Sequence, residues 1–439
     1  MNAPPAALLP ALLATLLLAG ACTASGGAAR PGPLPAPALV PGIVRYEAAA
    51  RVEPAAGSVA ARFRLSFLAD EGTADSVAFV LNRGLHVHEV SGPAVRGHRS
   101  APSPVTDAWT QVVVELDGSV AAGDPVMLEV AYGGVPVLPE GGIGSISPAW
   151  VELNLDAMWQ PVLATFDRRM EGVLRLELPD SWTVVGSGTV ELAEGAYLLR
   201  STVLLPDVPF VAAPALERVE ADGFTVYFRG DGEADARRVL AAAAACAGYL
   251  NREFGGTRPL PPGRMVLVDR RDGGYARTDY IVLSDVSGDE PSLRQFLCHE
   301  LAHFWSTTAS FTSPEHWMSE GFAEYVSGRV VREQLGAEAF ARVVARWEEP
   351  GHGVGPVWTP EGTRRPGGAA MYRRAPAILH RLEGRIGAEA FARFLHRYMV
   401  EEVRTTARLL EILREEAGDE AVRWFVAELG RGAEGEAGR

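Results

Sequence analysis

The stretch that decides the fold runs from residue 299 to residue 325. It reads His299-Glu-Leu-Ala-His303, then sixteen residues, then Glu320-Gly-Phe-Ala-Glu-Tyr325. Two histidines four residues apart lie one turn apart on the same face of a helix. With the carboxylate of Glu320 they make the three-ligand set typical of a catalytic zinc site, in which the fourth position is left for water. The pattern therefore predicts one Zn²⁺ per chain, held by His299, His303 and Glu320.

Two acidic residues beside these ligands have predicted roles of their own. Glu300 is expected to be the general base that takes a proton from the water. Glu324 lies one turn from Glu320 and is expected to hydrogen-bond to a ligating histidine. The alternative is an exposed helix with scattered polar residues, since His-Glu-x-x-His is short and occurs by chance. Buried charges need partners or a metal, and burial of this helix is indicated by Phe296, Leu297, Leu301 and Phe304.

Length and composition limit the classes of protein to consider. With 439 residues, the chain is too long for one ordinary domain, so two or three are expected. Hydrophobic residues make up 47% of the chain, which is enough for sizeable cores. The formal net charge is −14, which argues against nucleic acid as a partner.

The N-terminal residues have the pattern of an export signal. Residues 6–20 form an apolar run rich in Ala and Leu that is too short to span a membrane comfortably, so residues 1–21 are expected to be a signal peptide. The run ends in a sequence similar to a bacterial lipoprotein cleavage site, which makes Cys22 a candidate for lipidation and membrane anchoring. The alternative is a free cysteine in a discarded leader. Residues 22–42, rich in Ala, Gly and Pro, are expected to be a flexible tether.

After this tether the sequence predicts two domains that differ in secondary structure. Residues 43–220 contain short alternating segments punctuated by Gly, Pro and Asp, the signature of an antiparallel β-sandwich. Residues 221–430 carry the predicted zinc site and are mostly helical. Residues 431–439 are expected to be disordered. The predicted fold class is therefore α+β and multidomain.

Two further cysteines, Cys246 and Cys298, fall in helices that are expected to be buried. One disulfide between them is compatible with an exported protein, but two buried free thiols are the favoured interpretation. Cys298 precedes His299 and points about 100° away from its face of the helix, so it is not expected to bind the metal.

At these motifs the chain resembles the aminopeptidase N family (membrane alanyl aminopeptidases) of gluzincin zinc metallopeptidases. The family pattern H-E-L-A-H-Q-W, then W-L-N-E-G-F-A, stands here as His299-Glu-Leu-Ala-His-Phe-Trp305 and Trp317-Met-Ser-Glu-Gly-Phe-Ala323. The connection between the two motifs is shorter than is usual in the family. A third match, to Y-x-K-G-x-x-x-L-H, is Tyr372-Arg-Arg-Ala-Pro-Ala-Ile-Leu-His380.

The resemblance covers most of the chain after the tether. It implies peptide substrates and an N-terminal β-sandwich followed by a thermolysin-like, mostly helical catalytic domain. It also implies that Tyr372 donates a hydrogen bond to the oxyanion formed during peptide hydrolysis. A phenol aimed at developing negative charge stabilises the transition state more than the substrate. Without the resemblance, Tyr372 is interpreted as a core aromatic on a helix.

Two departures from the family bear on specificity. The family motif G-A-M-E-N, which grips the free amine of the substrate, is matched by residues 273–278, so Gly273, Gly274 and Tyr275 are expected to bind substrate. The amine-binding Glu falls at Ala276, and a cation at the neighbouring Arg277 would repel an ammonium group. The family's large C-terminal helical domain has no counterpart, which implies a more open site. Carboxylates that could replace the lost Glu are Asp272, Asp279 and Glu152.

The sequence thus predicts an exported zinc metallopeptidase that resembles aminopeptidase N and has a weakened requirement for a free N-terminus. A related hydrolase or an endopeptidase is the alternative among enzymes. A catalytically inactive or impaired zinc-binding surface module is the alternative from another class. Glu300 argues against that module, because a structural site needs no base and usually closes all four positions with Cys or His. The oligomeric state is left open.

Overall fold

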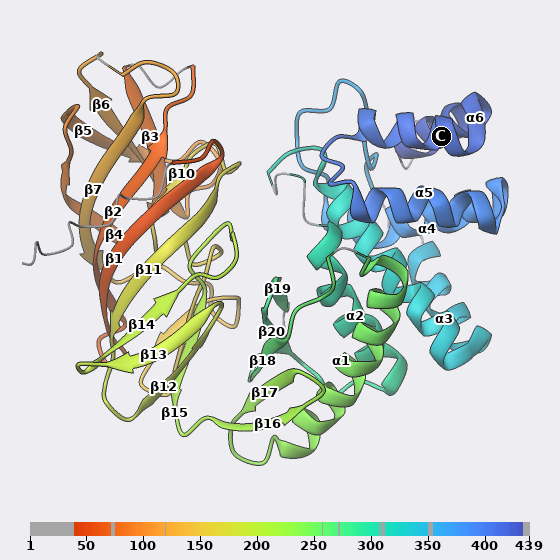
Figure 1. Ribbon diagram of the computed structural model, residues 1–439, viewed down its shortest axis with the longest axis horizontal. Coiled ribbons are helices and arrows are strands. Elements are labelled where there is room, and N and C mark those ends of the chain that lie inside the picture. The colour runs from red at the N-terminus through yellow and green to blue at the C-terminus, as the bar shows by residue number, and fades with distance from the viewer. Residues whose placement is uncertain are drawn as a thin grey trace, which may run out of the picture. The chain divides into compact units, whose positions relative to one another are not determined.

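A computed structural model gives the structure of the chain (Figure 1). It describes residues 39–432, apart from residues 72–74, 119, 257, 271–272, 307–308, 310–311 and 350–353. The predicted signal peptide, Cys22, most of the predicted tether, most of the C-terminal tail and Asp272 lie outside the described residues. Within the described part, no helix has the length and apolar character needed to cross a membrane.

The first half of the described chain forms three β-sheets. Their strand orders are β13-β14-β11-β1-β2-β7-β4, β10-β3-β6-β5 and β12-β15-β9-β8. Among the described strands of these sheets, neighbours are antiparallel except β1 and β11, which pair in parallel. The strands are β1 (Ile43–Glu53), β2 (Ser58–Leu68), β3 (Ser76–Asn82), β4 (Leu85–Ser91), β5 (Val95–Pro102), β6 (Trp109–Leu116), β7 (Pro125–Gly134), β8 (Ser145–Ser147), β9 (Trp150–Leu153), β10 (Val162–Leu163), β11 (Arg169–Glu177), β12 (Trp182–Gly186), β13 (Thr189–Ala193), β14 (Ala196–Arg200) and β15 (Phe210–Pro214).

Alternating apolar and polar residues explain why these strands form a sandwich. Successive side chains of a strand point to opposite faces of the sheet. In β2, Phe63 and Phe67 are buried, whereas Arg62 and Arg64 are exposed and pair with Glu129 on β7. The inward side chains of all three sheets meet in one apolar core.

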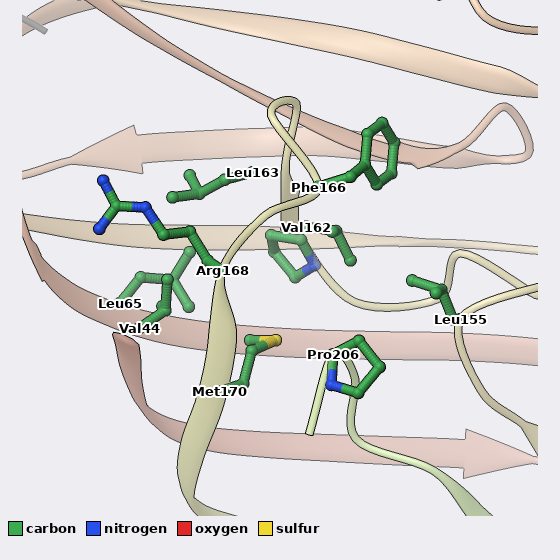
Figure 2. A pocket seen from close by; sticks show the side chains of 10 residues that line it. Val44, Leu65, Leu155, Val162, Leu163, Phe166, Arg168, Met170 and Pro206 are labelled. Atoms are coloured by element: carbon green, nitrogen blue, oxygen red, sulfur yellow. The ribbon is translucent and has the colours of Figure 1, made fainter. Parts of the chain in front are cut away.

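One small cavity lies inside this sandwich (Figure 2). Its lining is apolar except for Arg168, whose guanidinium pairs with Asp70. The volume is about 10 Å³, which is room for about one water molecule. The cavity is therefore a gap in the packing and too small for an organic ligand.

The second half begins with a five-stranded sheet. Its order is β16-β17-β18-β20-β19, with β16 (Glu217–Ala221), β17 (Phe224–Phe228), β18 (Gly263–Val268), β19 (Tyr275–Arg277) and β20 (Tyr280–Ser284). Helix α1 (Glu233–Phe254) packs on β16 and β17, and helix α2 (Glu290–Ser306) lies beside β19 (Figure 1). Strand β16 pairs with β17 and contains the predicted boundary between residues 220 and 221; the domain boundaries stay a prediction.

The rest of the described chain is helical. It contains α3 (His316–Glu348), a π-helical turn η1 (Ala370–Arg374), α4 (Ala375–Ile386), α5 (Ala388–Val400) and α6 (Thr406–Gly430). Gly336 in α3 and Gly418 in α6 have φ angles of +87° and +80°, which favour glycine, so each marks a break between two helical segments. The apolar faces of α1 to α6 share one core. A β-sandwich followed by this helical half confirms the predicted α+β multidomain fold class.

The structure corrects the interpretation of two cysteines. Cys246 in α1 and Cys298 in α2 form a disulfide, with their Cα atoms 5.3 Å apart. Both side chains are fully buried, as expected, but the favoured interpretation as free thiols is wrong. The sequence could not show that α1 packs against α2 with these two cysteines side by side. The bond ties α1 to the helix that carries the two histidines.

Candidate active site

The two histidines and the glutamate come together as their spacing predicts. His299 and His303 lie one turn apart on α2, and Glu320 lies near the start of α3, which packs against α2. His299 Nε2 lies 3.2 Å from His303 Nε2 and 3.3 Å from Glu320 Oε2, and His303 Nε2 lies 3.5 Å from that same oxygen. Among the described residues, this is the one group of His, Cys, Asp or Glu side chains arranged to hold a metal ion.

The distances between these three donor atoms fit a tetrahedral zinc ion. Bonds of about 2.0–2.1 Å to a tetrahedral centre place the donor atoms about 3.3–3.4 Å apart. The donors here lie 3.2 to 3.5 Å apart. Imidazole nitrogen and carboxylate oxygen are also the donors found in catalytic zinc sites. The side chains therefore fit the predicted ion and supply three of its four positions.

Burial and charge set the protonation of two of these groups. Burial alone would raise the pKa of the Glu320 carboxyl, but positive charge at His303 and hydrogen bonds from His299, His303 and His316 hold this pKa well below its usual range. Burial lowers the pKa of His299, but hydrogen bonds to Glu320 and Glu324 outweigh burial and raise this pKa well above its usual value. Glu320 is therefore ionised. A metal that binds His299 displaces a proton from this histidine.

Glu324 lies where the sequence predicted support for a histidine. Its Oε2 is 3.0 Å from His299 Nδ1, and its Oε1 accepts hydrogen bonds from Gln295 Nε2 and, at 2.9 Å, from Trp347 Nε1. A carboxylate that accepts from one ring nitrogen fixes the orientation of the ring and leaves the other nitrogen for the metal. The carboxylate thereby turns His299 Nε2 toward His303 and Glu320.

Two residues that support the other ligands were not predicted from the sequence. His316 Nε2 lies 3.0 Å from Glu320 Oε1. Ser306 Oγ lies 3.3 Å from His303 Nδ1 and donates to the carbonyl oxygen of Ser319 at 3.2 Å. Helical spacing could have indicated both, since His316 is four residues before Glu320 and Ser306 is three after His303.

Glu300, the predicted general base, lies between the histidines in sequence and is buried. Burial raises the pKa of its carboxyl, although positive charge at His299 and His303 opposes the shift. No described residue donates a hydrogen bond to this carboxylate. A buried carboxylate with raised proton affinity and no competing donor is suited to take a proton from water. The assignment of Glu300 as the base stays a prediction.

Tyr372 comes to the same site from η1. Its ring centroid lies 5.8 Å from that of His299, and its side chain is 40% exposed. Burial of the hydroxyl and the negative charge of Glu320 raise the pKa of the phenol, so it stays protonated at neutral pH and can donate a hydrogen bond. The exposure argues against the interpretation of Tyr372 as a core aromatic. Its role at the oxyanion stays a prediction.

The stretch expected to bind substrate forms β19 and the turn before it. Gly273 has a φ of +69°, and a Cβ added at Gly274 would lie 2.6 Å from Phe296 of α2. This close approach requires glycine. The side chain of Tyr275 is buried against Tyr280, so only its backbone can meet a substrate. Substrate binding by Gly273, Gly274 and Tyr275 stays a prediction.

Arg277, which was expected to repel a substrate amine, has a partner of its own. Its Nε donates to Asp207 Oδ1 at 2.7 Å, and its Nη2 donates to Asp207 Oδ2 at 3.0 Å. Asp207 is buried on the sandwich side of the molecule. A bidentate pair of this kind offsets the charge of the guanidinium. The repulsion by Arg277 is therefore weaker than that of an isolated cation.

The carboxylates suggested as substitutes for the lost Glu also have partners. Glu152 is buried and pairs with Arg270 at 2.8 Å. Asp279 accepts hydrogen bonds from Ser187 Oγ and, at 2.9 Å, from the backbone N–H of Gly188. Both carboxylates form contacts between the sandwich and the five-stranded sheet. Neither is therefore left without a partner to bind a substrate amine.

No protein-family model matches the sequence, and no curated protein matches it either. Solved structures do match the fold. An M1 zinc metallopeptidase from Deinococcus radiodurans is 19% identical, with a TM-score of 0.65 over 88% of this chain and 93% of that chain. A mutant of an M1 zinc metallopeptidase from Deinococcus radiodurans, bound to a Tyr-Ser-Ala substrate, is 21% identical, with a TM-score of 0.64 over 88% and 93% of the two chains.

A third match is the native LTA4 hydrolase of yeast. It is 16% identical to this chain, with a TM-score of 0.71, and the match covers 90% of this chain and 68% of that one. Likeness at 16 to 21% identity concerns the arrangement of the backbone. Over 88% of its length, the chain has the fold of these M1 zinc metallopeptidases.

Proposed function

We propose that the protein is a zinc metallopeptidase that hydrolyses peptide bonds. The observation that carries this proposal is the spacing of 3.2 to 3.5 Å among the donor atoms of His299, His303 and Glu320. Glu300 lies beside the first histidine in the sequence. The fold supports the proposal, because two of the matched structures are zinc metallopeptidases and one of these holds a Tyr-Ser-Ala substrate.

Each residue of the site has a defined task in this reaction. Zinc, when bound, polarises the scissile carbonyl and activates water for attack. Glu300 takes the proton from the attacking water and later passes it to the leaving amine. Tyr372 donates its phenol hydrogen to the oxyanion as negative charge develops there. Glu324 holds His299 in the orientation that the site needs.

We propose a weakened requirement for a free N-terminus, unlike that of aminopeptidase N. The position of the amine-binding carboxylate is taken by Ala276 on β19. Arg277 is paired with Asp207, and Glu152 is paired with Arg270. A substrate ammonium therefore finds no uncommitted carboxylate among these residues. Peptides with a blocked amine are expected to bind about as well as free ones.

Export of the chain, with membrane anchoring through a lipidated Cys22, is also part of the proposal. The apolar run at residues 6–20 supports export. The disulfide between Cys246 and Cys298 supports it too, because structural disulfides persist mainly in oxidising compartments outside the cytosol.

An inactive zinc-binding module is less well supported. A structural zinc site has its four positions closed by protein ligands, whereas three protein ligands come together here among the residues that the structure describes. Tyr372 also lies beside the ligands with a protonated phenol, for which a purely structural site has no use.

The direct test of this function is a digest of a mixed peptide library, read by mass spectrometry. The zinc-loaded protein and the same protein stripped by a chelator are compared. We expect new peptide ends with the zinc-loaded protein and none after stripping. The positions of the cuts show whether the enzyme cleaves only next to the N-terminus of a peptide or also within it. No cleavage by the zinc-loaded protein, or equal cleavage after stripping, contradicts the proposal.

A further inference from the structure

Among the described residues, the side chain of His316 makes one polar contact, and this contact is with a predicted metal ligand. Its Nε2 lies 3.0 Å from Glu320 Oε1. A carboxylate only accepts hydrogen bonds, so the nitrogen that faces Glu320 carries the hydrogen and donates it. The other ring nitrogen, Nδ1, is buried and has no hydrogen-bond partner among the described residues. The hydrogen bond of this buried ring to a described residue is therefore the one that it donates to Glu320.

The backbone around His316 is held in place from both sides. Glu315 Oε2 accepts hydrogen bonds from the backbone N–H and the hydroxyl of Thr406. Trp317 Nε1 donates to Thr406 Oγ1 at 3.0 Å. These contacts bind the start of α3 to the start of α6, so His316 reaches Glu320 from a fixed position and not from a mobile loop.

The two oxygens of Glu320 face different histidines. Oε1 faces His316, whereas Oε2 faces His299 and His303 at 3.3 and 3.5 Å. A carboxylate that used both oxygens on the metal would take up the position that a catalytic site keeps open. A hydrogen bond donated to Oε1 disfavours binding of that oxygen to the metal, so Oε2 is the ligand atom.

We propose that His316 is a positioning residue that makes Glu320 bind the metal through one oxygen. This inference rests on the proposed function, because it needs His299, His303 and Glu320 to hold zinc. Each ligand then has its own support: His299 has Glu324, His303 has Ser306, and Glu320 has His316. Loss of such a support typically weakens metal binding about 10- to 100-fold.

The test measures zinc affinity by competition with a chromophoric chelator, so it does not depend on peptidase activity. His316→Leu removes both ring nitrogens at similar volume. His316→Gln keeps a donor that can reach Glu320. The matched control is His380→Leu, because His380 lies on α4 with its Nδ1 3.9 Å from Glu383 and touches none of the predicted ligands. Thermal unfolding of each metal-free variant checks that it is folded.

We expect His316→Leu to bind zinc about 10- to 100-fold more weakly than the wild type. His316→Gln should recover most of this loss, and His380→Leu should bind as the wild type does. Cobalt-substituted protein gives a second readout, because visible absorption reports the number of ligands around Co²⁺ and should change in His316→Leu. Unchanged affinity in His316→Leu, or a loss that His316→Gln does not recover, overturns the inference. No zinc binding by the wild type would instead overturn the proposed function.

Discussion

Glu324 Oε2 lies 3.0 Å from His299 Nδ1, and this contact decides which nitrogen of His299 faces the other ligands. The carboxylate accepts the hydrogen on Nδ1, so Nε2 is the nitrogen whose lone pair becomes available when a metal displaces its proton. Nε2 lies 3.2 Å from the matching nitrogen of His303. The same carboxylate is held by Trp347 and Gln295, so the orientation is built into the packing of α2 against α3 before any metal arrives.

The first prediction concerns metal content. Wild-type protein is expected to hold one zinc per chain, and His303→Ala to hold almost none, since two remaining ligands do not complete a catalytic site. His396→Ala is the control, because His396 contacts the carbonyl oxygen of Glu253 and lies outside the ligand group. Metal analysis of the three purified proteins makes the comparison. Equal zinc in wild type and His303→Ala would refute the assignment.

The second prediction concerns the disulfide between Cys246 and Cys298. The bond closes a loop of 52 residues, and a loop of this length is expected to stabilise the folded state by about 4 kcal/mol through the unfolded chain. The double variant Cys246→Ala/Cys298→Ala should therefore have a clearly lower Tm than the wild type. A reductant should lower the Tm of the wild type and leave that of the variant unchanged. Equal Tm values in both proteins would show that the bond contributes nothing.

The third prediction concerns Tyr372. Tyr372→Phe should lower kcat by roughly 10²–10³ and leave KM nearly unchanged, because the phenol hydrogen bond is made mainly in the transition state. Steady-state kinetics on one peptide measure both constants. A raised KM with unaltered kcat would instead make Tyr372 a residue that binds the ground-state substrate.

The fourth prediction concerns the amine of the substrate. Loss of one charge-assisted contact, here through Ala276, removes about 1.5–3 kcal/mol of discrimination, or about ten- to a hundredfold. The value of kcat/KM for one peptide is therefore expected to change little when its amine is acetylated. A preference above about a thousandfold for the free amine would show that another carboxylate grips the ammonium group.

The local part of the site could be predicted from the sequence. His299, His303, Glu320 and Glu324 lie on two helices at spacings of one turn, and helical periodicity alone places each pair on one face. The same rule would have found His316, one turn before Glu320. The sandwich followed from alternating strands, because burial of one face imposes a period of two on the sequence.

Contacts between distant residues could not be predicted in this way. Arg277 and Asp207 are 70 residues apart in sequence, and their pairing exists only because the sandwich packs against the five-stranded sheet. The disulfide likewise depends on how α1 packs on α2. The parallel pairing of β1 with β11 joins strands more than a hundred residues apart. Periodicity fixes which face of an element is buried and says nothing of what it is buried against.

We propose that a metal site assembled on α2 and α3 hydrolyses peptides with Glu300 as its base. The most direct measurement is zinc content and peptide hydrolysis in wild type and Glu300→Gln, side by side. The amide keeps the shape of the side chain but does not accept the proton, so we expect equal zinc in both proteins and a rate of hydrolysis lower by about 10²–10⁴ in Glu300→Gln. Hydrolysis by Glu300→Gln at the wild-type rate, with zinc bound, would contradict it.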